Sequence, residues 1–123
     1  MSLILIVEDN DKNMKLARDI LNAKGYQTVE AVTGEEGVKL AKERKPHLVL
    51  MDIQLPGING IEAFRQIRAD AKTSRIPVVA LTASVTPTDR SEISAAGFDA
   101  FIGKPINLKE FVETVKRLLE GKK

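Results

Sequence analysis

The chain lacks cysteine and tryptophan, and it has a single histidine among its 123 residues. Without cysteine, neither a disulfide framework nor a cysteine-based zinc site can form. One imidazole is too few for a histidine cluster around zinc, and it excludes catalysis that needs two imidazoles. Because only 4% of the residues are aromatic, platforms on which nucleic-acid bases stack are disfavoured. Any chemistry must therefore come from carboxylates, hydroxyls, lysine and a hard metal ion.

An excess of one charge is also missing. The 19 Lys and Arg residues outnumber the 17 Asp and Glu residues by only two, which is too small a surplus to indicate nucleic-acid binding. No apolar run approaches the length of a membrane span, and the N-terminus has no signal-peptide pattern. We therefore expect a cytoplasmic protein without nucleic-acid or membrane partners. Its length fits one domain, predicted at residues 1–120, with a C-terminal tail at residues 121–123.

Short apolar runs alternate with helix-like stretches along the chain. The runs are Leu3–Val7, Gln27–Ala31, His47–Met51, Ile76–Leu81 and Phe98–Ile102. The first and third are nearly all apolar, as central parallel strands are, whereas the second is more polar, as an edge strand is. Five βα units in series predict an α/β fold, a doubly wound (βα)5 five-stranded parallel sheet with the flavodoxin-like strand order 2-1-3-4-5.

Capping residues mark several predicted helix ends. The signals are Thr33 with Glu36, Asn107 with Glu110, and the glycine stops Gly25 and Gly97. The predicted fourth helix, Pro87–Ala96, begins at the N-cap Thr86 and has Ile93 as its only large apolar residue. A helix with so narrow an apolar stripe is expected to dock loosely.

Polar residues follow four of the five runs, where ligands bind in sheets of this kind. They are Glu8 and Asp9 after the first run, Asp52 after the third, Thr82 after the fourth and Lys104 after the fifth. Three neighbouring carboxylates repel one another unless a cation lies among them. An all-oxygen donor set selects a hard ion, Mg²⁺ or Mn²⁺. A carboxylate nucleophile beside a metal, a lysine and a hydroxyl suits phosphoryl transfer.

These residues belong to motifs that resemble the receiver domain of two-component response regulators over nearly the whole chain. The motifs are Val7-Glu8-Asp9-Asn10, Met51-Asp52-Ile53-Gln54-Leu55-Pro56-Gly57, Asn59-Gly60, Leu81-Thr82-Ala83 and Lys104-Pro105. Each residue alone has an ordinary structural explanation, such as a turn, a cap or a solvated side chain, so the resemblance rests on all five motifs together. The chain is most similar to single-domain receivers of the bacterial cell-cycle and phosphorelay type.

The resemblance implies a role for each site residue. Asp52 would accept a phosphoryl group from a phosphohistidine and would also ligate Mg²⁺. Asp9 would ligate the metal directly, Glu8 would act beside it largely through water, and Gln54 would add its backbone carbonyl. Thr82 would contact the phosphoryl group, and the small Ala83 beside it would leave the site open. Lys104 would form an ion pair with the phosphoryl group, and Pro105 would follow a cis peptide bond. Phe101 would form a switch together with Thr82.

The implied function is a phosphorylation-controlled signalling switch. Phosphorylation would shift the face formed by the fourth helix, fifth strand and fifth helix, for output to a protein partner or for phosphorelay. A histidine kinase, a histidine phosphotransfer protein or both would supply the phosphoryl group. The domain would catalyse only its own phosphorylation and dephosphorylation, so it would not be an enzyme in the usual sense. We expect a monomer or weak dimer.

Two other functions use similar chemistry or the same fold. A Mg²⁺-dependent hydrolase that forms an aspartyl phosphate usually has a second acid two residues after its nucleophile, where this chain has Gln54. A flavin- or nucleotide-binding module needs a phosphate-binding loop after the first strand, where this chain has an acidic segment, residues 8–11. His47 is predicted at the start of the third strand, roughly 16 Å from Asp52 at about 3.3 Å per residue, and is interpreted as a surface residue.

Overall fold

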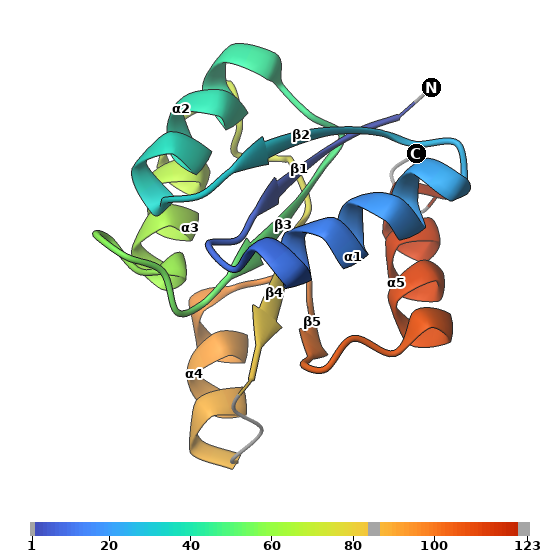
Figure 1. Ribbon diagram of the computed structural model, residues 1–123. Coiled ribbons are helices and arrows are strands. Elements are labelled where there is room, and N and C mark those ends of the chain that lie inside the picture. Colours follow the sequence, from blue (N-terminus) through green and yellow to red (C-terminus); the bar gives the residue numbers. More distant parts are fainter. Residues whose placement is uncertain (1, 84–86, 121–123) are drawn as a thin grey trace.

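The chain folds as five βα units in series (Figure 1). The computed structural model describes residues 2–83 and 87–120. The strands are β1 (Leu3–Val7), β2 (Gln27–Ala31), β3 (Leu48–Asp52), β4 (Val78–Thr82) and β5 (Ala100–Gly103). The helices are α1 (Asp11–Ala23), α2 (Gly34–Arg44), α3 (Gly60–Ala69), α4 (Pro87–Ala96) and α5 (Leu108–Glu120). The tail predicted at residues 121–123 and the predicted N-cap Thr86 lie outside the described residues.

All five strands are parallel and lie in the order β2-β1-β3-β4-β5. This confirms the predicted doubly wound sheet and its strand order. β3 and β4 are buried along their whole length, and β1 is buried from Ile4 to Val7. In the edge strand β2, Gln27 and Glu30 are exposed, the two residues between them are half-buried, and only Ala31 is buried. The most apolar runs of the sequence are thus the strands with neighbours on both sides.

Helices cover both faces of the sheet. Figure 1 shows α1 and α5 on one side and α2 and α3 on the other. Alternate residues of β1 divide between the two cores, since Ile4 and Ile6 pack with α1 and α5 while Leu5 and Val7 pack with α2 and α3. A strand that is covered on both faces has no place for a charged side chain until it ends. In β1, β3 and β4, polar side chains are therefore confined to the two edges of the sheet where these strands begin and end.

Three strands begin one or two residues later than the apolar runs indicated. At the start of β4, Ile76 donates its backbone N–H to a turn carbonyl, that of Thr73, at 3.1 Å, and the next residue, Pro77, has no N–H to donate. The apolar runs thus include residues of the approach to each strand. The same strands also end one residue after the apolar runs, so that Asp52 and Thr82 are the last residues of β3 and β4. These two side chains are therefore held by the sheet and not by a loop.

The predicted N-caps Thr33 and Asn107 are confirmed, and Asn10 and Asn59 cap two further helices in the same way. In each of these four helices, the side-chain oxygen of the N-cap residue accepts the backbone N–H of the residue three positions later. Gly25 and Gly97 end α1 and α4 with φ angles of 90° and 102°, which favour glycine. Because each cap follows a strand within a few residues, the helices start at the same edge of the sheet as the predicted site.

α4 has the weakest apolar packing of the described helices. Among its described side chains, only Ile93 is buried, at 3% exposed, and Ala96 packs at the edge of the core beneath α3. The remaining described positions are exposed. This agrees with the narrow stripe in the sequence, and the loose docking of α4 stays a prediction.

Arg68 of α3 ties together the segments that lead into β4 and β5. Its guanidinium group donates to the carbonyl of Ile76 at 2.5 Å and pairs with Asp99 Oδ2 at 2.6 Å. The same group lies 4.9 Å from the centre of the Phe64 ring. Asp99 Oδ2 also accepts the backbone N–H of Val78 at 2.8 Å. One partly buried side chain thus joins a helix to the starts of two strands.

We expect Arg68→Ala to lower the free energy of unfolding by about 1–2 kcal/mol, because the Ile76 carbonyl and the Asp99 carboxylate lose a charged donor. Urea unfolding followed by circular dichroism measures the change. Arg65→Ala is the matched control, since Arg65 is exposed on the same helix and its loss should change stability by less than about 0.5 kcal/mol. Equal stability of the two variants would contradict the role of Arg68.

Candidate functional site

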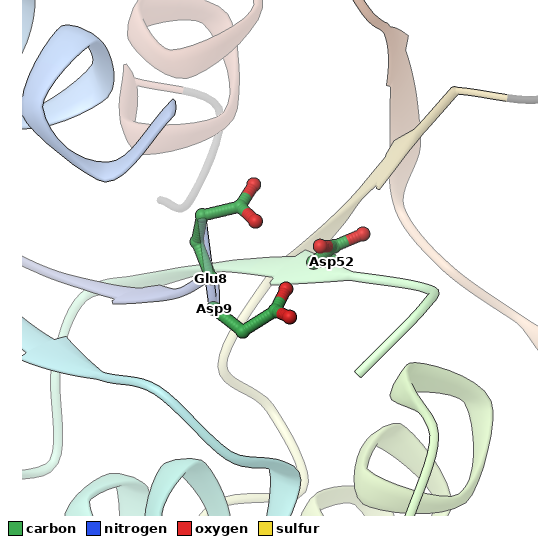
Figure 2. Close-up of side chains that lie close together, drawn as sticks. All are labelled: Glu8, Asp9 and Asp52. Atoms are coloured by element: carbon green, nitrogen blue, oxygen red, sulfur yellow. The ribbon is translucent and has the colours of Figure 1, made fainter. Parts of the chain in front are cut away.

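Three carboxylates gather beyond the ends of β1 and β3. Glu8 and Asp9 follow β1 directly, and Asp52 is the last residue of β3. One carboxylate oxygen from each lies within 4.8 Å of the others, and Figure 2 shows the three side chains extending to the same side of the strand ends. Glu8 and Asp52 are 1% and 4% exposed, whereas Asp9 is exposed. The predicted cluster is thus present, with Asp9 as its solvent-facing member.

The ammonium group of Lys104 lies between two of these carboxylates. Its Nζ is 2.7 Å from Glu8 Oε1 and 3.1 Å from Asp52 Oδ2. Lys104 follows β5, and β3 and β4 separate β5 from β1 in the sheet. The side chain therefore reaches across the ends of two strands. Its backbone is held at its base, where its N–H donates to the carbonyl of Thr82 at 2.8 Å.

Backbone N–H groups hold the other oxygens of the two buried carboxylates. Asp52 Oδ1 accepts from the backbone of Gln54 at 3.2 Å. Glu8 Oε2 accepts from the backbone of Asn10 at 3.1 Å. Each buried acid therefore has one oxygen on a backbone donor and the other on Lys104, which fixes the orientation of both carboxylates.

Burial and charge shift two pKa values at the site. Burial raises the pKa of Glu8, and although the Lys104 hydrogen bond opposes this, the neighbouring Asp52 adds to the rise. For Lys104, burial lowers the pKa, but the hydrogen bond with Glu8 and the charge of Asp52 outweigh it, and the pKa is raised. Lys104 therefore stays protonated. Three acids facing one ammonium still leave an excess of negative charge, which attracts a further cation.

The other predicted residues surround this cluster. Thr82 ends β4 and is 4% exposed, and Ala83 after it is exposed. The peptide bond between Lys104 and Pro105 is cis. Phe101 in β5 is 38% exposed, and the guanidinium group of Arg90 from α4 lies 5.3 Å from the centre of its ring. The ring therefore lies on the α4 side of the sheet, opposite to its neighbour Ile102, which packs with α1 and α5.

His47 lies apart from this cluster, as predicted. It is exposed just before β3, and its Nδ1 accepts the backbone N–H of Leu3 at 3.0 Å. Both residues lie where strands begin, so the single imidazole is at the opposite edge of the sheet. Contrary to the prediction, β3 begins one residue after His47, at Leu48.

The contact between Lys104 and Glu8 is the feature that the sequence did not predict. The motifs indicated that both residues lie at strand ends, but the resemblance assigned Lys104 to the phosphoryl group and Glu8 to water. The two residues are 96 positions apart, and no local pattern encodes which of three acids a lysine approaches. The contact follows from the width of two intervening strands and the reach of the lysine side chain.

Comparisons with known proteins agree with this geometry. The family model of the response regulator receiver domain matches residues 4–116. The chain belongs to the response regulator receiver family. It is 44% identical over 116 residues to the polar-differentiation response regulator DivK of Brucella anthropi, covering 94% of each chain. DivK of Brucella ovis matches equally well. The predicted likeness to stand-alone receivers of the cell-cycle type is thus confirmed.

Solved receiver structures have the same fold. The receiver domain of the sensor histidine kinase PA1611 of Pseudomonas aeruginosa, solved with a magnesium ion coordinated in its active site cleft, superimposes with a TM-score of 0.91 at 32% identity. That match covers 97% of this chain and 98% of the other. A response regulator from Chloroflexus aurantiacus gives a TM-score of 0.92 at 28% identity, over 97% and 98% of the two chains.

Membership of the receiver family settles the broad function. The chain is a receiver domain of a two-component system, a phosphorylation-controlled switch and not a conventional enzyme. The hydrolase alternative and the flavin-module alternative find no support in these comparisons. Receivers act with histidine kinases or phosphotransfer proteins. Among residues 2–83 and 87–120, no helix has the length and apolarity needed to cross a membrane.

Receiver domains bind Mg²⁺ in an acidic pocket, and the donors of this receiver fit that ion. The cluster offers carboxylate oxygens only, without nitrogen or sulfur, which suits a hard cation. The exposed Asp9 gives access from solvent, and the nearby Lys104 neutralises only part of the charge. Mn²⁺, predicted from the same donors, finds no support in the comparisons.

Removing the lysine tests whether its ion pairs support the receiver fold. We expect Lys104→Ala to lower the free energy of unfolding by about 1–3 kcal/mol without added metal, because the carboxylate of Glu8 stays buried without its counter-charge. A second change, Glu8→Gln, should recover part of that loss by removing the unpaired charge. Thermal and urea unfolding measure both effects.

Lys109→Ala is the matched control, since Lys109 is exposed on α5. It should leave stability within about 0.5 kcal/mol of the wild type. An unchanged stability of Lys104→Ala, or no recovery in the double variant, would contradict the importance of the Lys104–Glu8 pair.

Proposed function

We propose that Asp52 is the phosphoacceptor of this receiver and takes its phosphoryl group from a phosphohistidine on a partner protein. The observation that supports this is the position of Asp52 among the three acids. It is held at the end of a buried strand, with Gln54 N–H on one oxygen and Lys104 on the other. Asp9 and Glu8 lie on its flank. Asp52 differs from the other two acids because it is itself the last residue of a strand, whereas Glu8 and Asp9 follow the end of β1.

The proposed transfer is a displacement at phosphorus. An oxygen of the Asp52 carboxylate attacks the phosphorus and forms an acyl phosphate. The bond between phosphorus and the imidazole nitrogen breaks, the electron pair stays on that nitrogen, and the imidazole takes up a proton from solvent. Lys104 keeps its positive charge throughout and pairs with the phosphoryl oxygens, as its raised pKa favours.

The residues that would hold Mg²⁺ are Asp9, Asp52 and the backbone carbonyl of Gln54, with Glu8 beside them. A bound Mg²⁺ ion supplies positive charge that offsets the charge of the phosphoryl group. The magnesium reported in the PA1611 receiver supports this assignment by analogy. Glu8 is almost fully buried and paired with Lys104, which supports a role that acts through the lysine or through water more than as a direct ligand.

Thr82 and Phe101 are proposed to convert phosphorylation into a change of surface. Thr82 lies at the end of the strand next to that of Asp52, since β4 pairs with β3 in the sheet. The Phe101 ring is partly exposed on the α4 side, and Ala83 leaves space beside Thr82. The limited apolar anchoring of α4 supports the face formed by α4, β5 and α5 as the region that responds.

The proposed partners are proteins: a histidine kinase or a phosphotransfer protein as donor, and a further protein for output. The near balance of charge and the family membership support this proposal. A cytoplasmic location, a monomer or weak dimer, the domain bounds 1–120 and the self-catalysed dephosphorylation stay predictions.

Phosphorylation by a small donor tests the acceptor. We expect the wild-type chain with Mg²⁺ and acetyl phosphate to gain one phosphoryl group by intact mass spectrometry, and Asp52→Asn to gain none, because the amide cannot attack phosphorus. Chelation of the metal should abolish the gain. Asp19→Asn, a change of an exposed acid on α1, is the control and should be labelled like the wild type. A labelled Asp52→Asn chain, or an unlabelled wild type, would overturn the proposal.

Beryllofluoride, a mimic of the phosphoryl group, tests the responding face. With Mg²⁺, we expect the largest amide shifts within residues 82–104, since this stretch contains Thr82, α4 and Phe101. Two-dimensional NMR of the isotope-labelled protein measures these amide shifts. Shifts confined to α2 would contradict the proposed output face.

A further inference from the structure

The segment between β3 and α3 follows the proposed acceptor Asp52 directly. It consists of residues 53–59, called the acceptor loop here. Backbone hydrogen bonds hold its two ends: Ile53 donates to the carbonyl of Leu81 at 3.0 Å, and Gly60 donates to the carbonyl of Ile53 at 2.9 Å. The backbone at the start of α3 packs closely against the backbone of Asp52, since a Cβ on Gly60 would lie 2.1 Å from the carbonyl oxygen of Asp52. The ends of the loop are therefore fixed.

The middle of the acceptor loop has a single described hydrogen bond. For residues 55–58, the only backbone N–H or carbonyl with a partner within the described chain is the N–H of Ile58. It donates to the carboxylate of Glu35, whose Oε2 lies at 3.2 Å. Glu35 is in the first turn of α2, 23 residues away in the sequence. A side chain from another helix thus holds the middle of the loop.

Two glycines make room for this contact. Gly57 has a φ of 74°, which side chains rarely adopt. A Cβ on Gly57 would lie 2.6 Å from Glu35 Oε1 and 2.7 Å from Oε2, so the carboxylate occupies the space of the missing side chain. A Cβ on Gly34 would lie 2.7 Å from both Cγ1 and the carbonyl oxygen of Ile58. The start of α2 and the acceptor loop therefore fit closely at two successive residues.

We propose that Glu35 is a positioning residue that fixes the acceptor loop and so prepares the Asp52–Gln54 segment for the metal and the phosphoryl group. The inference rests on the proposed function of Asp52. Gln54, whose carbonyl is assigned to the metal, begins the stretch whose middle Glu35 holds. A loop that samples fewer conformations loses less entropy when its carbonyl becomes a ligand. Glu35 acts through the loop and touches neither the metal nor the phosphoryl group.

A simpler explanation is that Glu35 stabilises its own helix. Acids in a first turn interact favourably with the helix dipole, and Glu36 beside it does so while it accepts the N–H of Val32 at 2.9 Å. Glu35 differs because its carboxylate points away from its own helix, onto Gly57 and Ile58. Its negative charge could also attract the metal from a distance, so an experiment must separate charge from contact.

Three variants make that separation. Glu35→Ala removes contact and charge, and Glu35→Gln removes the charge but keeps an oxygen that can accept the N–H of Ile58. Glu43→Ala removes an exposed acid near the other end of α2 and is the control. Hydrogen exchange of the Ile58 amide without metal reports on the contact. NMR titration with MgCl₂ gives the Mg²⁺ dissociation constant.

We expect the Ile58 amide to exchange about three- to tenfold faster in Glu35→Ala, as the loss of one hydrogen bond implies. The Mg²⁺ dissociation constant should rise about two- to fivefold in the same variant. Glu35→Gln should stay within about twofold of the wild type in both measurements, and Glu43→Ala should match the wild type. Gly57→Ala should displace the carboxylate, so that adding Glu35→Ala to it has little further effect on either quantity.

The outcomes distinguish this inference from the proposed function. A wild-type chain that binds no Mg²⁺ and takes no phosphoryl group would overturn the proposed function, and with it the role given to Glu35. If the wild type binds Mg²⁺, unchanged Ile58 exchange and unchanged Mg²⁺ affinity in Glu35→Ala would overturn the inference alone. Equal weakening of Mg²⁺ binding in Glu35→Ala and Glu35→Gln would also overturn it, because charge and not contact would then be the cause.

Discussion

Burial of the parallel sheet on both faces is the constraint on which the rest of this receiver depends. β3 and β4 have no exposed residue along their length, so charged groups can stand only where the strands begin or end. His47 lies at the edge where the strands begin. The three clustered acids, Thr82 and Lys104 lie at the edge where the strands end. The same burial makes the strands rigid supports, and Asp52 and Thr82 are part of them. The site is therefore built on the sheet, with its loops added around it.

The charges at that edge are balanced within the fold before any ligand arrives. Lys104 forms an ion pair with one oxygen of Glu8 and one of Asp52, and backbone N–H groups donate to the other two oxygens. The balance is incomplete, since three carboxylates face one ammonium group. A site with this residual negative charge favours a divalent ion. The positive charge of the ion would in turn reduce the repulsion between the acids and an approaching phosphoryl group. Structural and functional roles thus coincide in the same lysine.

Elements with a local signal were predictable from the sequence. The capping side chains at Thr33 and Asn107 and the glycine stops at Gly25 and Gly97 depend on neighbours within a few residues, and the structure has them. The strand starts were less accurate, because residues such as Ile76 are apolar whether they pair in the sheet or approach it through a turn. Hydrophobicity reports burial, and it does not report which backbone groups are bonded.

The sequence by itself determined the five βα units, the edge at which the acids and lysine meet, and the family, because alternation and motif spacing are one-dimensional properties. Only the tertiary structure decided that Lys104 pairs with Glu8 and that Glu35 reaches the backbone of Ile58. Both contacts join residues from different βα units, and both depend on distances of a few ångström set by strand width, helix placement and the absence of a side chain at Gly57. No local pattern encodes such distances, since they result from the packing of all the units together.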